Sequence, residues 1–340
     1  MKKFLSLMLA VLLVCTATAG LAEGKTASVF YGGGTPLSID PALNSASSGS
    51  NVLKLAQTGL MGYQWIDGKE TLSPELAESY TLSEDSRTYV FTLREGLKWS
   101  DGTDFSASQL VSSWNRAASA DLGADYGFMY DIIEGYGTEK LNVVADDAAR
   151  TVTVTLINPT AYFLDLCAFP TFYPVKVENA DNEGAWATKP GSYIGMTKYS
   201  VDDVIGFEKN PYYWNADAVK LDGVNCYLSE DNVAILTAYE NGSSQFINSI
   251  DPTEYPRLQT TYPGELQFGP YIGTWYVLFN VHKDVSPVGK PLTIPEQSKA
   301  RFAIGQMVNR QELVEFVTQG GQVPATGFYP NSLSDGLNAN

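Results

Sequence analysis

The chain has 340 residues, of which 44% are hydrophobic and 12% aromatic, and this composition excludes an intrinsically disordered protein. Its length allows two or three domains. A formal net charge of −16 opposes binding to nucleic acid or to an anionic membrane surface, because both would repel the chain.

The N-terminus has the features of a secretory signal peptide. Two lysines precede the apolar run from Phe4 to Val14, which is too short to span a bilayer. Small residues follow, so cleavage after Ala19 or Ala22 is expected. We therefore predict that residues 1–22 are a signal peptide and that the protein is exported, to the periplasm or to the outer face of the cytoplasmic membrane.

Cys15 raises an alternative, because exported lipoproteins carry a lipidated cysteine directly after the apolar run. Val14 stands before it, where Gly, Ala or Ser is usual. Ordinary cleavage is therefore favoured, with a lipid anchor at Cys15 as the alternative. Export also permits a disulfide between Cys167 and Cys226, but two buried free thiols are the favoured state.

The first half of the chain predicts strands that alternate with helices. Residues 27–31 form a short strand, and Val52 to Leu60 indicate a helix after a serine-rich segment. Tyr89 to Leu93 alternate in a half-buried strand, while Leu141 to Ala145 and Val152 to Leu156 form a hairpin.

The segment from Arg94 to Arg116 joins a strand end, a turn and a helix start. Asp101 and Asp104 flank Gly102 as turn and cap residues. Ser106 and Gln109 have the spacing of a capping box, so a helix is expected to begin there. Trp99 and Trp114 are expected to be core anchors.

The second half continues the mixed pattern. Strands are predicted at Val204 to Phe207, Val224 to Leu228 and Trp275 to Phe279, and helices at about 232–241, 297–307 and 310–318. This alternation indicates an α/β protein with more than one lobe.

Enzyme signatures are mostly missing from the sequence. His282 is the sole histidine and lies in a polar loop, which removes histidine-clustered zinc sites. Residues 191–195 have their serine at the second position, whereas a nucleophile elbow (GxSxG) requires it at the third. The adjacent acids Asp146/Asp147, Asp202/Asp203 and Glu230/Asp231 lie in predicted turns, where acids are usually solvated. We predict no catalytic residue, no metal site, no cofactor and no enzymatic activity.

An aromatic cluster is the most suggestive binding feature. The cluster consists of Tyr271, Trp275 and Tyr276, with a Gly-Thr step between the first and the other two. Such amphipathic rings can line a cleft while their hydroxyl and indole groups donate hydrogen bonds. A strand edge packed into the core is the competing explanation for any one of them.

Several motifs, taken together and in order, resemble the oligopeptide-binding branch of the extracellular solute-binding proteins that serve ABC importers. The resembling segments are Leu37 to Pro41 ("LDP"), Pro74 to Tyr80 ("P-x-LAESW"), Phe91 to Arg94, Lys98 to Thr103, Ser113 to Arg116, Asn210 to Trp214 ("NPxYW"), Phe279-Asn280, and Ala300-Arg301 with Asn309-Arg310.

The chain also departs from the family pattern. Asn309 stands where Asp is usual, Gln245 replaces an acid, and Ser192-Tyr193 alter a turn. Family members run markedly longer, which suggests a C-terminally truncated sequence.

The resemblance implies a two-lobed periplasmic-binding-protein-like fold (type II, cluster C-like) with an extra sub-domain and an incomplete second lobe. In that scheme residues 23–55 and 166–255 form lobe I, 56–165 form the sub-domain and 256–340 form part of lobe II.

The resemblance further implies that the two lobes close on an extended peptide, held mainly by main-chain hydrogen bonds. It places ligand contacts at the following residues: Asn44, Ser45, Ala46, Ser47, Tyr126, Asn248, Tyr271, Trp275 and Tyr276. The implied partners are a peptide ligand and the permease subunits of an ABC transporter, with the protein itself a monomer.

Two kinds of alternative remain open. The same fold could bind an oligosaccharide, a metal chelate or a signalling peptide. A protein of another class, a secreted hydrolase, is disfavoured by the single histidine and by the acids in turns.

Overall fold

The computed structural model describes residues 25–32, 34, 36, 38–181, 185–188, 198–201, 204–269, 273–280 and 293–328. The chain divides into two compact units, Met1–Ser249 and Ile250–Asn340, which we call unit 1 and unit 2. Each unit is described by itself. The predicted signal peptide, Cys15, Tyr271, His282 and the Asp202/Asp203 pair lie outside the described residues.

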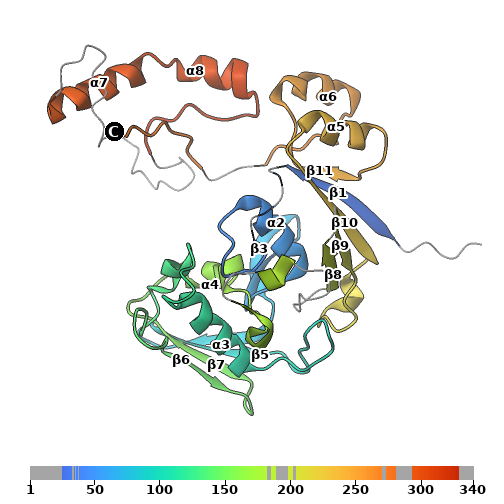
Figure 1. Cartoon of the computed structure of the whole chain (residues 1–340), viewed down its shortest axis with the longest axis vertical. Coiled ribbons are helices and arrows are strands. Elements are labelled where there is room, and N and C mark those ends of the chain that lie inside the picture. Colours follow the sequence, from blue (N-terminus) through green and yellow to red (C-terminus); the bar gives the residue numbers. More distant parts are fainter. Residues whose placement is uncertain are drawn as a thin grey trace, which may run out of the picture. The chain divides into compact units, whose positions relative to one another are not determined.

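Unit 1 contains a five-stranded mixed sheet in the order β11-β1-β10-β9-β8 (Figure 1). Its strands are β1 (Thr26–Gly32), β8 (Lys198–Val201), β9 (Ile205–Glu208), β10 (Gly223–Ser229) and β11 (Phe246–Ile247). β1 runs parallel to both β10 and β11, whereas β9 is antiparallel to β10 and β8. Helices α2 (Ser47–Ala56) and α5 (Asn232–Glu240) pack on β1.

A second sheet of unit 1 has four antiparallel strands in the order β4-β5-β7-β6, and β2 and β3 form a separate hairpin. The strands are β2 (Met61–Ile66), β3 (Lys69–Pro74), β4 (Ala77–Leu82), β5 (Thr88–Leu93), β6 (Val143–Asp146) and β7 (Thr151–Thr155). The predicted alternation of β5 is confirmed, because Tyr89, Phe91 and Leu93 are buried.

Helix α3 (Ala107–Ala118) lies against β6 and β7 (Figure 1). Its predicted capping box is confirmed: the Ser106 hydroxyl accepts from the Gln109 N–H, and the Gln109 side chain accepts from the Ser106 N–H. Trp99 and Trp114 are fully buried, as predicted. The indole of Trp114 donates to the Phe172 carbonyl at 2.9 Å, so this anchor also ties α3 to a distant segment.

Two hydrophobic clusters form the core of unit 1. One lies under the four-stranded sheet and includes Phe91, Trp99, Trp114 and Cys167. The other lies between α2 and the five-stranded sheet and includes Cys226. Both thiols are free and buried, as favoured from the sequence. Burial raises the pKa of Cys226 to about 12, so it is not a reactive thiolate near neutral pH.

The remaining helical segments belong to both units. They are α4 (Phe163–Leu166), α6 (Tyr255–Thr261), α7 (Ile294–Gln306), α8 (Arg310–Glu312) and the 3-10 turns Gly127–Tyr130, Pro170–Phe172, Val177–Asn179, Ala185–Thr188, Ala216–Ala218 and Pro252–Glu254. Among the described residues, no helix combines the length and apolarity needed to cross a bilayer.

Most predicted elements are confirmed, with three corrections. The helix after the serine-rich segment ends at Ala56, so Leu60 is a buried residue beyond it. The helix at 310–318 continues from α8 as a π-helical turn, Leu313–Thr318. Trp275 to Phe279 is not a strand in the structure. β-propensity alone does not make a strand, which also needs a partner for its backbone groups.

Candidate functional site

Two of the motif segments meet in a buried ion pair. Arg116 of α3 donates to both carboxylate oxygens of Asp40, at 2.8 and 3.3 Å, and the Trp186 indole donates to the same carboxylate at 2.9 Å. Asp40 is fully buried, and its carboxylate also accepts from the Ala42 N–H at 2.9 Å. Because Arg116 further donates to the Asp181 carbonyl, this cluster joins four separate segments of unit 1.

Three other motif segments meet around Glu75. Its carboxylate accepts from Tyr213 at 3.2 Å and from Gln64 at 2.7 Å. Arg94 donates to the Glu75 carbonyl and lies over the Trp214 ring, 3.7 Å from its centroid. Burial and the neighbouring carboxylate of Glu75 raise the pKa of Tyr213. This second cluster joins the strand ends of the smaller sheets to the segment after β9.

These contacts explain why the motifs identify the fold although they do not form the predicted peptide site. Polar groups of four motif residues form hydrogen bonds with one another and with backbone carbonyls of unit 1. These residues are Asp40, Glu75, Arg94 and Arg116. Sequence reasoning missed the part played by Trp186, because nothing local marks a tryptophan as the partner of an acid 146 positions earlier.

The predicted contact segment from Asn44 to Ser47 leads into α2. Asn44 is buried and donates to the Ser50 hydroxyl at 3.0 Å, while its carbonyl oxygen faces the Ala46 N–H. Ser45 is exposed and its hydroxyl donates to Asp125 at 2.8 Å. Asn44 therefore fixes the local conformation of the segment, whereas Ser45 is a polar residue on the surface.

The structure brings Tyr126 to this segment. Its hydroxyl donates to the Ser45 carbonyl at 3.4 Å, and its ring contacts Phe128 and Phe169. Two residues predicted separately, 81 positions apart, thus lie side by side in unit 1. They offer an aromatic ring, a hydroxyl and a peptide group on one surface.

Asn248 follows β11 directly, at the carboxyl edge of the parallel strands. Its N–H donates to the Phe30 carbonyl of β1 at 3.3 Å, and β1 also runs parallel to β10. Ligands of open α/β sheets commonly bind beyond the carboxyl ends of parallel strands. The ligand contact expected at Asn248 stays a prediction.

Trp275 and Tyr276 belong to unit 2 and are exposed, with 92% and 56% of their surface accessible. The Tyr276 ring contacts that of Phe328, with centroids 5.2 Å apart. The competing explanation, a strand edge packed into the core, is wrong for these two residues.

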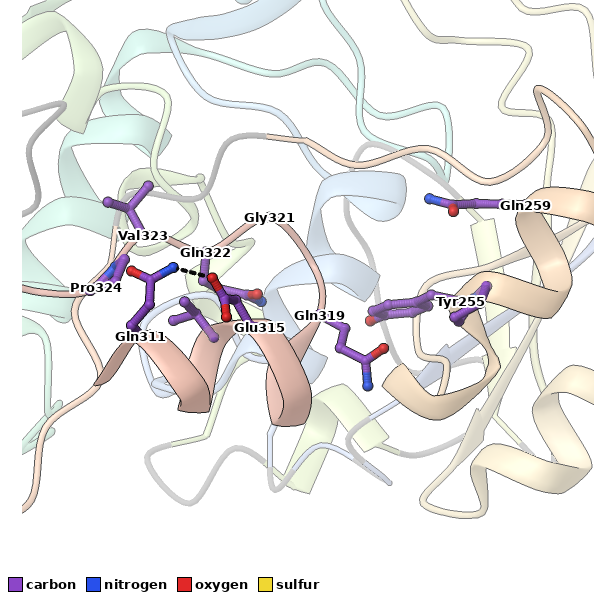
Figure 2. Close-up of a pocket in the computed structure, with 11 residues that line it drawn as sticks. Tyr255, Gln259, Gln311, Glu315, Gln319, Gly321, Gln322, Val323 and Pro324 are labelled. Carbon is purple, nitrogen blue, oxygen red and sulfur yellow. Dashed lines mark hydrogen bonds between the residues drawn. The ribbon is translucent and has the colours of Figure 1, made fainter. Parts of the chain in front are cut away.

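Unit 2 also contains a cavity of about 470 Å³ between α6 and the segment after α8 (Figure 2). Glutamines 259, 311, 319 and 322 line it together with Tyr255 and Glu315. Three of these glutamines already bond within their own segment: Gln311 to Glu315, Gln319 to the Phe316 carbonyl and Gln322 to the Gly320 N–H. Two segments that are distant in the sequence, 255–259 and 311–324, line the cavity, so no short window of the sequence indicates it.

Two of the acids considered for catalysis, Asp147 and Asp231, have structural roles. Asp147 accepts from the Ser108 hydroxyl and N–H, and these hydrogen bonds lower its pKa. Asp231 caps α5 by accepting from the N–H groups of Val233 and Ala234. The described part of the chain contains no group of three or more His, Cys, Asp or Glu that could hold a metal ion.

The chain is similar to curated peptide-binding proteins. It is 29% identical over 317 residues to the oligopeptide-binding protein OppA of Bacillus subtilis, covering 88% of this chain and 55% of that protein. It is 28% identical over 311 residues to the periplasmic murein peptide-binding protein MppA of Escherichia coli, covering 87% and 55%. The chain thus spans about half the length of the curated relatives it matches.

Solved structures show the same likeness. The murein tripeptide-binding protein MppA of Escherichia coli matches with a TM-score of 0.81 and 26% identity, over 93% of this chain and 62% of that one. OppA of Haemophilus influenzae, in complex with the peptide RPPGFSPFR, matches with a TM-score of 0.78 and 25% identity, over 92% and 61%. The predicted fold class, a two-lobed periplasmic-binding-protein fold, is confirmed.

A family model described as "Bacterial extracellular solute-binding proteins, family 5 Middle" matches residues 71–339. This match covers most of the chain and agrees with the motifs and the fold. The chain belongs to family 5 of the bacterial extracellular solute-binding proteins.

Proposed function

We propose that the protein is the exported substrate-binding component of an ABC importer, that it captures oligopeptides and that it delivers them to the permease subunits. The observation that carries this proposal is the match, in fold and in sequence, to proteins whose names state that they bind oligopeptides and murein peptides. The protein acts as a monomer and without a cofactor, and it performs no chemical step on its ligand.

The described surfaces of unit 1 fit this function. The proposed contacts from unit 1 are the exposed Ser45, the Tyr126 ring beside it and Asn248, which are polar or amphipathic residues that can contact a peptide without selecting one side chain. A site of this kind gives affinity with broad sequence tolerance. Binding would favour a closed state only if the closed state binds the peptide more tightly than the open one does.

Trp275 and Tyr276 are the proposed aromatic contacts from unit 2. Tryptophan fluorescence with a mixed pool of short peptides tests them. The proposal predicts a saturable change in emission for the wild-type protein. Trp275→Ala removes the tryptophan reporter at the proposed contact, and Tyr276→Ala weakens binding by about tenfold, a loss of roughly 1.4 kcal/mol.

Val233→Ala provides the matched control, because Val233 is also exposed, at 74%, but lies in α5 of unit 1 and is not a proposed contact. Its titration should match that of the wild type. An unchanged titration for both Trp275→Ala and Tyr276→Ala would contradict their assignment.

A further inference from the structure

A cavity of unit 1 lies at one end of the four-stranded sheet. Its volume is about 640 Å³, which is within the range of cavities that hold small molecules. The residues that line it include Glu78, Arg94, Glu95, Arg150 and Tyr212. None of the residues expected to contact a peptide lines this cavity, so it is separate from the site proposed above.

The register of the sheet brings the charged residues to this end. Leu93, the last residue of β5, is paired with Ala77 of β4, and its N–H donates to the Arg150 carbonyl at 2.8 Å. Arg94 follows Leu93 directly, and Glu78 follows Ala77. Charged residues of β4, of the chain after β5 and of the turn before β7 therefore lie at the same end of the sheet.

Two irregularities of the backbone place two of these residues. The pairing of β4 with β5 shifts between Ala77 and Ser79, so it skips Glu78, as in a β-bulge. Arg150 adopts a left-handed conformation with a φ of 56°, which is uncommon for a residue other than glycine. Bulges re-aim side chains, and unfavourable backbone conformations cluster at functional sites. Two such deviations beside one cavity favour a functional role for it.

The two arginines that line the cavity keep donors free for a ligand. Arg150 donates through Nη1 to the Leu93 carbonyl at 2.8 Å. Arg94 donates through Nε to the Glu75 carbonyl at 2.6 Å and through Nη2 to the Pro74 carbonyl at 3.3 Å. No carboxylate of the described residues forms a salt bridge with either arginine. The remaining guanidinium nitrogens are not buried, and a guanidinium group matches the geometry of a carboxylate.

The acids of the cavity are unpaired as well. Glu78 and Glu95 are exposed, and within the part of the chain that the structure describes neither carboxylate accepts a hydrogen bond or forms a salt bridge. Lys98 also lines the cavity, but its ammonium group pairs with Asp104. The unpaired charges of the lining are thus those of two arginines and two glutamates, and they balance.

This balance indicates the charge of the ligand. A simple anion would gain from the arginines, but the two glutamates and a chain with a net charge of −16 would repel it. A molecule that carries both a carboxylate and an ammonium group has no net charge and can pair with both kinds of side chain. The ring of Tyr212, which is 43% exposed, offers an apolar contact for the carbon atoms between the two groups.

We propose that this cavity is a second ligand site and that it binds a small zwitterion, an amino acid or a compound with the same pattern of charges. Arg94 and Arg150 hold the carboxylate, and Glu78 and Glu95 hold the ammonium group. The site uses residues other than the proposed peptide contacts, so either proposal can fail without the other.

Isothermal titration calorimetry with the full chain tests the proposal. The probes are glycine, γ-aminobutyrate and ε-aminocaproate, which carry the same two charges at increasing separation. Each is compared with two single-charge compounds of the same length: acetate and methylamine, butyrate and butylamine, or caproate and hexylamine. We expect saturable binding of at least one zwitterion, about tenfold or more tighter than that of its single-charge counterparts, because each counterpart lacks one set of charge-assisted hydrogen bonds.

Matched variants locate the binding. Arg150→Gln should weaken it about tenfold, the loss of a charge-assisted hydrogen bond. Arg87→Gln should leave it unchanged, because Arg87 also donates to a backbone carbonyl, that of Leu156, but does not line the cavity. Glu95→Gln should weaken binding as Arg150→Gln does, whereas Glu84→Gln, which changes another exposed acid, should not. Circular dichroism checks that all four variants are folded, and Glu95→Gln removes no hydrogen bond or salt bridge between described residues.

Several results would overturn the proposal. One is the absence of saturable binding for all three zwitterions, and another is equal affinity for a zwitterion and its single-charge counterparts. Equal effects of Arg150→Gln and Arg87→Gln would place the binding elsewhere. A loss in Arg150→Gln without a loss in Glu95→Gln would also contradict it, because the ammonium group would then not be held in this cavity.

Discussion

At the scale of single residues, Asp40 and Arg116 form a buried ion pair in unit 1. Asp40 is fully buried and 7% of the Arg116 side chain is exposed, so both charges have left water. Such a pair is costly to form, and removing one partner leaves the other charge buried and uncompensated. Among the described residues, the Nε of Arg116 has no hydrogen-bond partner.

Asp40→Asn should therefore lower the free energy of unfolding by about 3 kcal/mol, because it keeps the shape of the side chain but leaves Arg116 unpaired. Chemical denaturation measures this change. The control is Asp104→Asn, which removes an acid that is 87% exposed and pairs with Lys98. That variant should lose less than about 1 kcal/mol, and equal losses in the two variants would contradict the role of the buried pair.

Asp101 carries a residue-level prediction about pH. Partial burial disfavours its charge, but hydrogen bonds from Lys176 and Thr103 outweigh that effect and lower its pKa to about 2. An unfolded Asp titrates near pH 3.9. A carboxylate with a lowered folded-state pKa stabilises the fold above the unfolded pKa, and this stabilisation is lost as pH falls toward 2.

The midpoint of thermal unfolding, measured between pH 5 and pH 2, should accordingly fall less steeply in Asp101→Asn than in the wild type. Most of the difference should arise between about pH 4 and pH 2. Asp104→Asn again controls for the loss of one carboxylate from the same turn. Parallel curves for the wild type and Asp101→Asn would show that the bonds to Lys176 and Thr103 do not persist in solution.

At the scale of elements, α3 connects the four-stranded sheet to the rest of unit 1. It begins at a capping box, packs on β6 and β7, and carries both Trp114 and Arg116 to distant segments. Local hydrogen bonds therefore fix the start of the helix, and long-range contacts hold its C-terminal end.

Ser106→Ala should destabilise unit 1 by about 1 kcal/mol, since it removes one of the two reciprocal cap bonds. Ser112→Ala, on the exposed surface of the same helix, should be neutral or slightly stabilising, because Ala is the better helix former there. Denaturant titrations of both variants check the prediction, and a neutral Ser106→Ala would mean that packing alone fixes the start of α3.

Local sequence signals predicted α3 well, because the residues that fix its start lie close together in the sequence. The spacing of Ser106 and Gln109 and the alternation of Tyr89, Phe91 and Leu93 are visible in a short window, and both are present in the structure. Trp275 to Phe279 has equally strong local signals but no paired strand, so its prediction was wrong. A strand depends on a second segment, which no window of sequence can show.

The site could be predicted less completely than the fold. The sequence and the family resemblance pointed to Ser45 and Tyr126 separately, but their contact depends on how α2 and the turn after α3 pack, and this is a long-range property. The same limit applies to Trp186, which no motif marked and which supplies a hydrogen bond to the central carboxylate of Asp40.

At the scale of the whole molecule, the two units differ in kind. Unit 1 has two hydrophobic clusters and buried polar clusters that join its segments, whereas the described part of unit 2 has one buried hydrophobic residue, Leu258, and many exposed ones. The division of the chain into residues 23–55 with 166–255, 56–165 and 256–340 remains a prediction, as do the ligand contacts.

Peptide capture is the function proposed for this protein. Native mass spectrometry of the protein, purified without denaturation, tests this proposal. A bound population is expected whose added mass is released on denaturation as short peptides of mixed sequence. A bound sugar or metal chelate, or a protein that remains empty in a peptide pool, would contradict the proposal.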